Sequence, residues 1–102
     1  MIHVIATIEL HKDQRDTFLA EFRKLVPAVL AEPGCIEYGP TIDAETDITA
    51  QPLARDNVVT IVEKWESVEH LKQHLVAPHM QEYRPRVKSM IARSTLAILT
   101  PA

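Results

Sequence analysis

The residues best suited to proton chemistry lie in one short stretch of the sequence. Trp65, His74, His79 and Tyr83 fall within nineteen positions. Histidine titrates near neutral pH, so either imidazole could take up or release a proton there. Partial burial would keep an imidazole neutral, which suits a base that takes a proton from a phenol. The alternative is that Trp65 and the histidines are hydrogen-bonded core residues, a common role for such side chains in a small domain.

Two more residues, Tyr38 and Glu63, are expected neighbours of this group. Glu63 stands in an otherwise apolar segment, so it is either a pocket carboxylate or an edge residue facing solvent. Cys35 has no obvious base near it and is better explained as an inert small hydrophobic residue. The sequence therefore offers one carboxylate and several aromatic groups for a pocket, but no nucleophilic thiol.

The sequence does not predict a metal or nucleotide site. Four residues separate His74 from His79, and Pro78 interrupts any helix between them, so the pair does not have zinc-site spacing. The single cysteine excludes an internal disulfide and any multi-cysteine metal site. The two glycines, Gly34 and Gly39, match neither the dinucleotide nor the P-loop spacing. We expect no cofactor.

Length and charge narrow the class of protein. A chain of 102 residues is expected to form a single domain, residues 1–102, and would gain from sharing a core with a partner. The net charge of -3 argues against nucleic-acid binding. The first residues contain no signal-peptide or membrane-span pattern, so we expect no membrane association and a cytoplasmic location.

The elements that would position these residues can be predicted from periodicity. Alternating apolar residues from Ile2 to Ile8 predict a strand, and Asp13 could cap the helix that follows, with a kink or short break near Pro27. A turn is predicted at Glu32-Pro33-Gly34, where proline stops the helix and glycine tolerates positive φ. The other predicted elements are a strand at 35–42, a loop or loose hairpin at 43–57, a strand at 58–65, a short helix capped by Ser67, a helix opened by Pro78, and a strand at 93–100.

This order, strand-helix-strand-strand-helix-strand, is that of the split βαβ or ferredoxin-like α+β fold with an antiparallel sheet. Helices on one side of four strands leave the other face of the sheet open. Several residues expected there are apolar, and an exposed apolar patch usually marks an association surface. We therefore expect a homodimer that packs sheet against sheet.

Several segments of the chain form a recognisable set: Leu25-Val26-Pro27-Ala28-Val29-Leu30, Glu32-Pro33-Gly34-Cys35, Glu63-Lys64-Trp65-Glu66-Ser67 with His70-Leu71, and His74-Leu75 followed by Pro78-His79-Met80. These segments resemble the antibiotic biosynthesis monooxygenase (ABM) domain family, and the small bacterial quinol monooxygenases in particular. The resemblance spans nearly the whole chain. It implies a dimeric α/β barrel with one pocket in each subunit.

The resemblance also implies an activity: oxygenation of a quinol or related phenol by O2 without flavin, haem or metal. Such a site needs a base, a dry aromatic pocket and hydrogen bonds to the substrate anion. On this reading His79 is the first candidate for the catalytic base and His74 the second. Trp65 and Tyr83 would position the ring, with Tyr38 bonded to a quinol oxygen and Glu63 a further pocket residue.

Related domains have other functions, so alternative functions of this chain stay open. An isomerase of a small phosphorylated metabolite would need phosphate donors, for which Arg84 and Arg86 are available. A non-catalytic domain that binds or senses a quinone is a second alternative. Haem-degrading members use an asparagine on the first strand, where this chain has Val4, Ala6 and Thr7 as the expected inward residues, so a haem function is disfavoured.

Overall fold

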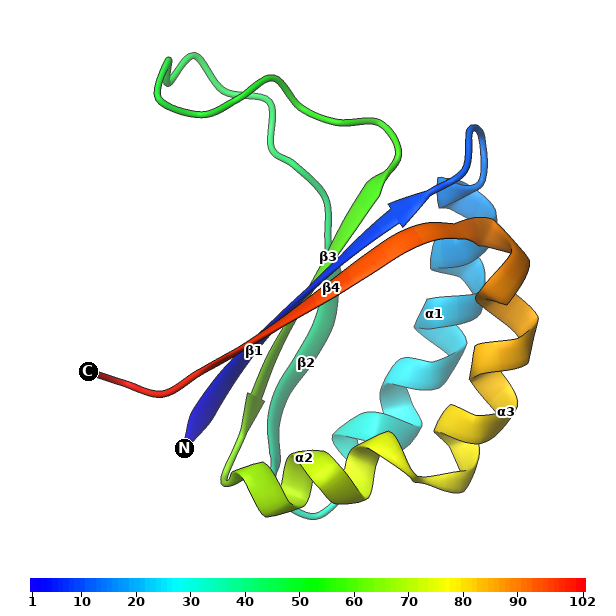
Figure 1. Ribbon diagram of the computed structural model, residues 1–102, viewed down its shortest axis with the longest axis vertical. Helices are drawn as coiled ribbons and strands as arrows, with labels where there is room; N and C mark the ends of the chain where they lie inside the picture. Colours follow the sequence, from blue (N-terminus) through cyan, green and yellow to red (C-terminus); the bar gives the residue numbers. More distant parts are fainter.

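The computed structural model describes all 102 residues and has the predicted α+β architecture (Figure 1). Its elements are β1 (Ile2–Leu10), α1 (Arg15–Leu30), β2 (Cys35–Thr41), β3 (Val58–Trp65), α2 (Val68–Leu75), α3 (Pro78–Val87), the single-turn 3₁₀ helix η1 (Lys88–Met90) and β4 (Ile91–Leu99). The strands form one antiparallel sheet in the order β2-β3-β1-β4, so the ferredoxin-like prediction is confirmed. None of the helices has the length and apolar character needed to cross a membrane.

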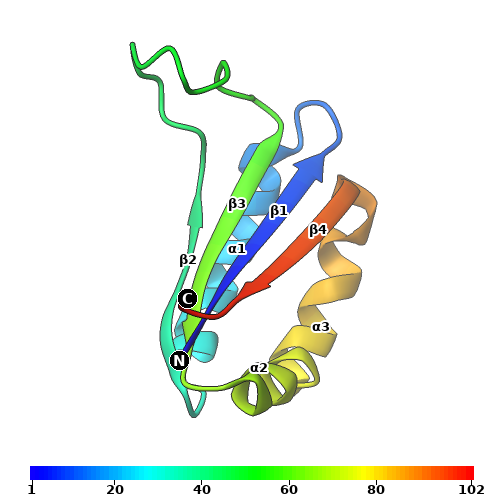
Figure 2. The same ribbon diagram turned by 60° about the vertical axis from the view of Figure 1, so that its left-hand side comes forward.

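All the helices lie on one face of the sheet, as Figures 1 and 2 show from two directions. Strand alternation turns every second side chain toward them. Val4 and Ala6 of β1 are buried on this face, as are Val59 and Ile61 of β3. Thr7 lies on the opposite face, where it pairs with Thr60 and Thr95, so its expected inward position is wrong. A neighbour of Ala6 must point the other way in a regular strand.

Two details of α1 differ from expectation. The residue at the helix N-cap is Gln14, and no side chain caps this end. Asp13 instead adopts a positive φ of 63° in the turn after β1, so it does not cap the helix. The helix also runs without a break through Pro27, whose carbonyl accepts the backbone N–H of Ala31. Its buried face carries Phe18 and Phe22, which stack 5.9 Å apart.

The turn after α1 brings the end of this helix against the start of α2. Gly34 has φ 81°, a conformation that suits glycine. A Cβ at this position would lie 2.3 Å from Cγ of His70, and the Gly34 carbonyl accepts the backbone N–H of Glu66. Ser67 caps α2 as predicted, accepting the N–H of His70. This packing places the end of α1 next to the helices that carry the two candidate histidines.

The 43–57 segment has no regular secondary structure, as predicted, and it projects away from the sheet (Figures 1 and 2). An ion pair closes its base: the Arg55 guanidinium donates to both carboxylate oxygens of Asp43. This arginine also holds the pKa of the Asp43 carboxyl well below its usual range, at about 2. Arg15 of α1 donates to the Arg55 carbonyl and ties the base of the loop to the body of the domain.

The face of the sheet without helices is crossed by two uncharged rows. One row runs through all four strands as Gly39, Val62, Ile5 and Ala97. The adjacent row consists of four threonines, Thr41, Thr60, Thr7 and Thr95. An uncharged band across the middle of an open sheet face is the pattern expected of an association surface.

Candidate functional site

A cavity of about 290 Å³ lies between the helix-covered face of the sheet, α1, α3 and β4. Ten of its fifteen lining residues are hydrophobic, so its walls suit an apolar or aromatic ligand. Its apolar walls include Phe18 and Phe22 of α1, Ile61 of β3, Met80 and Tyr83 of α3, and Leu96 of β4. Its five other lining residues are polar or charged: Glu63, His74, Arg84, Ser94 and Thr95. Tyr38 also lines it and adds a hydroxyl group.

His74 is the histidine that reaches this cavity. It comes from the end of α2, is 2% exposed and lies against the rings of Trp65 and Tyr38, with centroids 4.8 and 5.4 Å away. Its Nδ1 lies 2.8 Å from Oε2 of Glu32. No completely buried side-chain nitrogen or oxygen lacks a hydrogen-bond partner, and Nε2 of His74 makes no hydrogen bond, so Nε2 keeps some accessible surface. Because His74 lines the cavity and its Nδ1 faces Glu32, Nε2 is the ring nitrogen left available to the cavity.

Burial keeps this imidazole neutral. Removal from water lowers the pKa of His74 below its ordinary value, although the hydrogen bond and charge of Glu32 oppose the change. His79 and Arg84, which also face it, add to the lowering. A neutral imidazole with one free ring nitrogen open to a cavity can accept a proton from a bound hydroxyl group.

Glu63 is a pocket carboxylate rather than a solvent-facing edge residue. It is 5% exposed, and its Oε1 accepts the indole N–H of Trp65 at 2.9 Å. Burial raises the pKa of Glu63 to about 7, with a further increase from the charge of Glu32, while the hydrogen bond from Trp65 opposes the rise. Glu63 can therefore exist in either protonation state at neutral pH.

The two tyrosines of the cavity are neutral hydrogen-bond donors. Burial raises the pKa of both Tyr38 and Tyr83 far above the ordinary value. Phe22 lies between them, stacked on Tyr38 at 5.5 Å and edge-on to Tyr83 at 6.0 Å. The Tyr38 hydroxyl makes no hydrogen bond within the chain and is thus free to bind a ligand.

The other two predicted site residues, Trp65 and His79, do not line the cavity. Trp65 is completely buried, and its role here is to bind Glu63 and to pack against His74. His79 lies in the first turn of α3 and is partly exposed, and its Nε2 lies 2.8 Å from Oε2 of Glu32. The cluster in the sequence thus divides into a residue at the cavity, His74, and residues that support it.

Glu32 is the residue of this arrangement that sequence reasoning missed. It follows α1 in the turn before Pro33, 42 positions from His74 and 47 from His79, so no local spacing connects the three. The only signal in the sequence is its place in a Glu-Pro-Gly turn, which predicts the end of a helix. The contact depends on how the end of α1 packs against α2.

Glu32, His74 and His79 are also of the ligand types that bind transition metals, and their donor atoms lie within 4.8 Å of one another. However, Oε2 stands 2.8 Å from each imidazole nitrogen, the separation of a hydrogen bond. A nitrogen that donates its proton to this oxygen has no lone pair for an ion. We therefore interpret the three side chains as a hydrogen-bonded cluster.

Cys35 lies on β2, partly buried beside the same region. Burial raises the pKa of its thiol to about 11, and the charges of Glu32 and Glu63 add to the rise. A thiol that stays protonated at neutral pH is a poor nucleophile. The interpretation of Cys35 as a small packing residue agrees with this environment.

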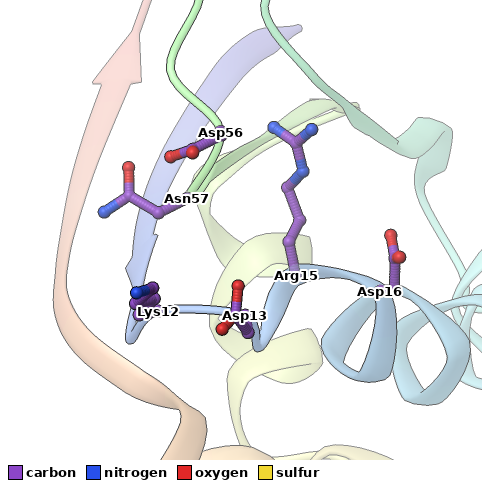
Figure 3. A pocket seen from close by; sticks show the side chains of 6 residues that line it. All are labelled: Lys12, Asp13, Arg15, Asp16, Asp56 and Asn57. Atoms are coloured by element: carbon purple, nitrogen blue, oxygen red, sulfur yellow. The ribbon is translucent and has the colours of Figure 1, made fainter.

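A larger hollow of about 520 Å³ lies at the other end of the sheet, beside the turn after β1 (Figure 3). Six polar or charged residues line it and no hydrophobic one does: Lys12, Asp13, Arg15, Asp16, Asp56 and Asn57. Figure 3 shows that these side chains come from three segments and do not converge on a single point. The hollow lacks the apolar walls that an aromatic ligand requires.

Comparison with known proteins identifies relatives of the whole chain. A sequence model of the family described as "Antibiotic biosynthesis monooxygenase" matches residues 1–86. The chain is 40% identical over 103 residues to the "Probable quinol monooxygenase YgiN" of Escherichia coli K12, with 99% of this chain and 98% of that protein covered.

Solved structures share the fold at lower identity. The crystal structure of PA3566 from Pseudomonas aeruginosa is similar with a TM-score of 0.82 and 20% identity, covering 99% of this chain and 93% of that one. The structure of Rv0793 from Mycobacterium tuberculosis has a TM-score of 0.81 and 24% identity, with coverage of 99% and 94%. At these sequence identities the similarity shows a shared fold and nothing more.

Proposed function

The chain belongs to the antibiotic biosynthesis monooxygenase family and is an oxidoreductase, and we propose that it oxidises a quinol or related phenol with O2 without a cofactor. The observation that carries this proposal is the cavity itself. It combines aromatic walls with a free imidazole nitrogen, the arrangement needed to hold a planar phenol and remove its proton. The name of the E. coli relative supports a quinol as the substrate class.

The chemistry balances without an external reductant. Removal of a hydroxyl proton gives a quinol anion, which passes one electron to O2. The two radicals then combine by forming a carbon–oxygen bond, and loss of water leaves a hydroxylated quinone. One quinol and one O2 thus give one hydroxyquinone and one water. The protein needs to supply a base, orientation and a water-poor site.

In this proposal His74 is the base, because it lines the cavity and its lowered pKa keeps the imidazole neutral and thus able to accept a proton. This geometry favours His74 over His79, the first candidate from the sequence. Tyr38 and the protonated form of Glu63 would donate hydrogen bonds to substrate oxygens. Tyr83 would bound the ring opposite the sheet, while Trp65 would hold Glu63 from behind.

One observation favours the isomerase alternative. Arg84 lines the cavity and is a cation of the kind that binds phosphate. Its guanidinium, however, donates to the Leu75 carbonyl, and Arg86 does not line the cavity.

A quinone-sensing domain would use the same aromatic walls but would need no base.

The remaining features of the proposal concern the whole protein. We propose that residues 1–102 act as one domain and that two copies form a homodimer through the open sheet face, with the uncharged rows at its centre. A lone thiol and no disulfide suit a reducing compartment, so the cytoplasm is the proposed location.

The test is oxygen uptake by metal-free protein supplied with a reduced naphthoquinol, compared with autoxidation in the absence of protein. His74→Ala should lower the enzymatic rate by about 10²–10⁴-fold, the usual effect of losing a general base. The matched control is His11→Ala, an exposed histidine in the turn after β1. Wild-type protein that binds the quinone but takes up no oxygen would support the sensor, and turnover of a phosphorylated ketose without oxygen would support the isomerase.

A further inference from the structure

We propose that Glu32 is a positioning residue that makes His74 a base, by fixing its tautomer and by stabilising the imidazolium formed when it takes a proton. His79 serves as the second donor that holds the Glu32 carboxylate in place. The inference rests on the proposed function, in which a proton leaves a substrate hydroxyl group in the cavity. It adds a carboxylate outside the cavity to the catalytic machinery.

The three side chains meet at the junction of three helices. Glu32 follows α1, His74 lies in the last turn of α2 and His79 lies in the first turn of α3. A single carboxylate oxygen, Oε2, lies 2.8 Å from Nδ1 of His74 and 2.8 Å from Nε2 of His79. The buried imidazole thus touches the carboxylate on one side and the cavity on the other.

This geometry determines where the proton of His74 resides. An ionised carboxylate can only accept hydrogen bonds, so the nitrogen that faces it must carry hydrogen. His74 is therefore protonated on Nδ1, which leaves the lone pair on Nε2, the accessible nitrogen. Without Glu32 the neutral ring could place its proton on either nitrogen, and the Nε2–H form cannot act as a base.

The same contact stabilises the charged form. When Nε2 takes a proton from the substrate oxygen, the ring becomes an imidazolium and no other bond breaks. The Nδ1–H remains on Glu32, so a cation faces an anion at hydrogen-bond distance in a buried site. This opposes the effect of burial, which by itself would make His74 too weak a base.

The groups around the pair fit this role. Trp65 and Tyr38 pack against the ring of His74. Arg84 and His79 are the cationic or potentially cationic groups that disfavour protonation of His74, and Glu63 is the other carboxyl of the cavity. Among these groups only Glu32 bonds directly to the ring.

The experiment compares wild type with Glu32→Gln, which keeps the shape of the side chain but removes its charge. We expect kcat to fall by about 10²-fold or more with KM little changed, because the residues that line the cavity are the same in both proteins. The acid limb of the pH–rate profile should move to lower pH, because His74 loses the charge that favours its protonation. Glu32→Asp, which keeps the charge, should restore part of the rate. The control is Glu69→Gln, an exposed carboxylate on the same helix as His74.

A second measurement needs neither substrate nor turnover. Nitrogen-15 NMR of the imidazoles should find the His74 proton on Nδ1 in wild type and shared between the nitrogens in Glu32→Gln. A wild-type ring protonated on Nε2 would overturn the inference, even if Glu32→Gln fails to fold. An unchanged pH profile and rate in a folded Glu32→Gln would also overturn it. Absence of oxygen uptake in wild type, with the expected NMR result, would count against the proposed oxygenase and not against the Glu32–His74 pair.

Discussion

Glu63 is a carboxyl group held inside a mostly apolar cavity, and its surroundings decide its charge. Burial raises its pKa from the ordinary value of 4.5 to about 7. Because the folded state binds this proton more tightly than the unfolded state, Glu63 contributes its full stabilisation below pH 4.5. This contribution is lost as the pH rises through 7. The difference between the two values corresponds to about 3 kcal/mol.

We therefore expect the free energy of unfolding of wild type, relative to Glu63→Gln, to decrease by about 3 kcal/mol between pH 4.5 and pH 8. Urea denaturation of both proteins at several pH values, at one fixed protein concentration, measures this. Glu45→Gln, an exposed carboxylate of the 43–57 loop, is the control. A constant difference across the pH range would mean that Glu63 titrates normally in the folded protein.

The two candidate histidines have different surroundings in the folded protein. His74 and His79 differ little in sequence context, but one is 2% exposed beside a cavity and the other lies partly exposed at a helix start. Loss of activity should therefore be greater in His74→Ala than in His79→Ala, measured by oxygen uptake. Equal losses would indicate that the second imidazole takes a direct part in the reaction.

At the scale of elements, the turn between α1 and β2 connects the fold to the site. It carries Glu32 and depends on Gly34, which combines a φ of 81° with close approach to His70. An added methyl group there would strain the backbone and meet the imidazole ring. The same turn sets the distance from Glu32 to the histidines of α2 and α3.

Gly34→Ala should destabilise the protein by about 1–3 kcal/mol, as expected for a residue forced into a sparsely populated conformation. Thermal or urea unfolding at one fixed protein concentration measures the effect relative to wild type. Adding His70→Ala should recover the part of the loss that comes from the clash. If Gly34→Ala is as stable as wild type, the turn must be able to relax.

At the scale of the whole molecule, the open sheet face remains to be covered. Its central row of Gly39, Val62, Ile5 and Ala97 crosses all four strands without a charge, next to a row of threonines. Burying such a band against its own copy would gain apolar contact and pair it with an equally uncharged surface. The proposed homodimer follows from this surface.

Ile5→Lys, which places a charge in the middle of that row, should convert the dimer to a monomer in sedimentation experiments. Leu30→Lys is the control, since Leu30 is half-exposed on α1, on the helix side of the sheet. A monomeric wild type, or an Ile5→Lys variant that remains a dimer, would contradict the proposed interface.

Local patterns in the sequence were enough for the fold. Alternation in β1 and β3, helical spacing in α1, the Ser67 cap and Pro78 each act within a few residues, so the order of elements follows from them. The details that failed, at Asp13 and Thr7, are conformations of single residues that neighbouring packing determines.

Only part of the candidate site could be predicted from the sequence. Residue types alone placed His74, Glu63, Tyr38 and Tyr83 among the candidates, because aromatic and titratable groups suit phenol chemistry. Which of them face one cavity, and that Glu32 joins His74 across 42 positions, was decided by the tertiary structure. A hydrogen bond between distant segments depends on how the helices pack. Burial shifts the pKa values of Glu63 and His74. Helix packing and burial are properties of the folded chain, so the local spacing of residues does not reveal them.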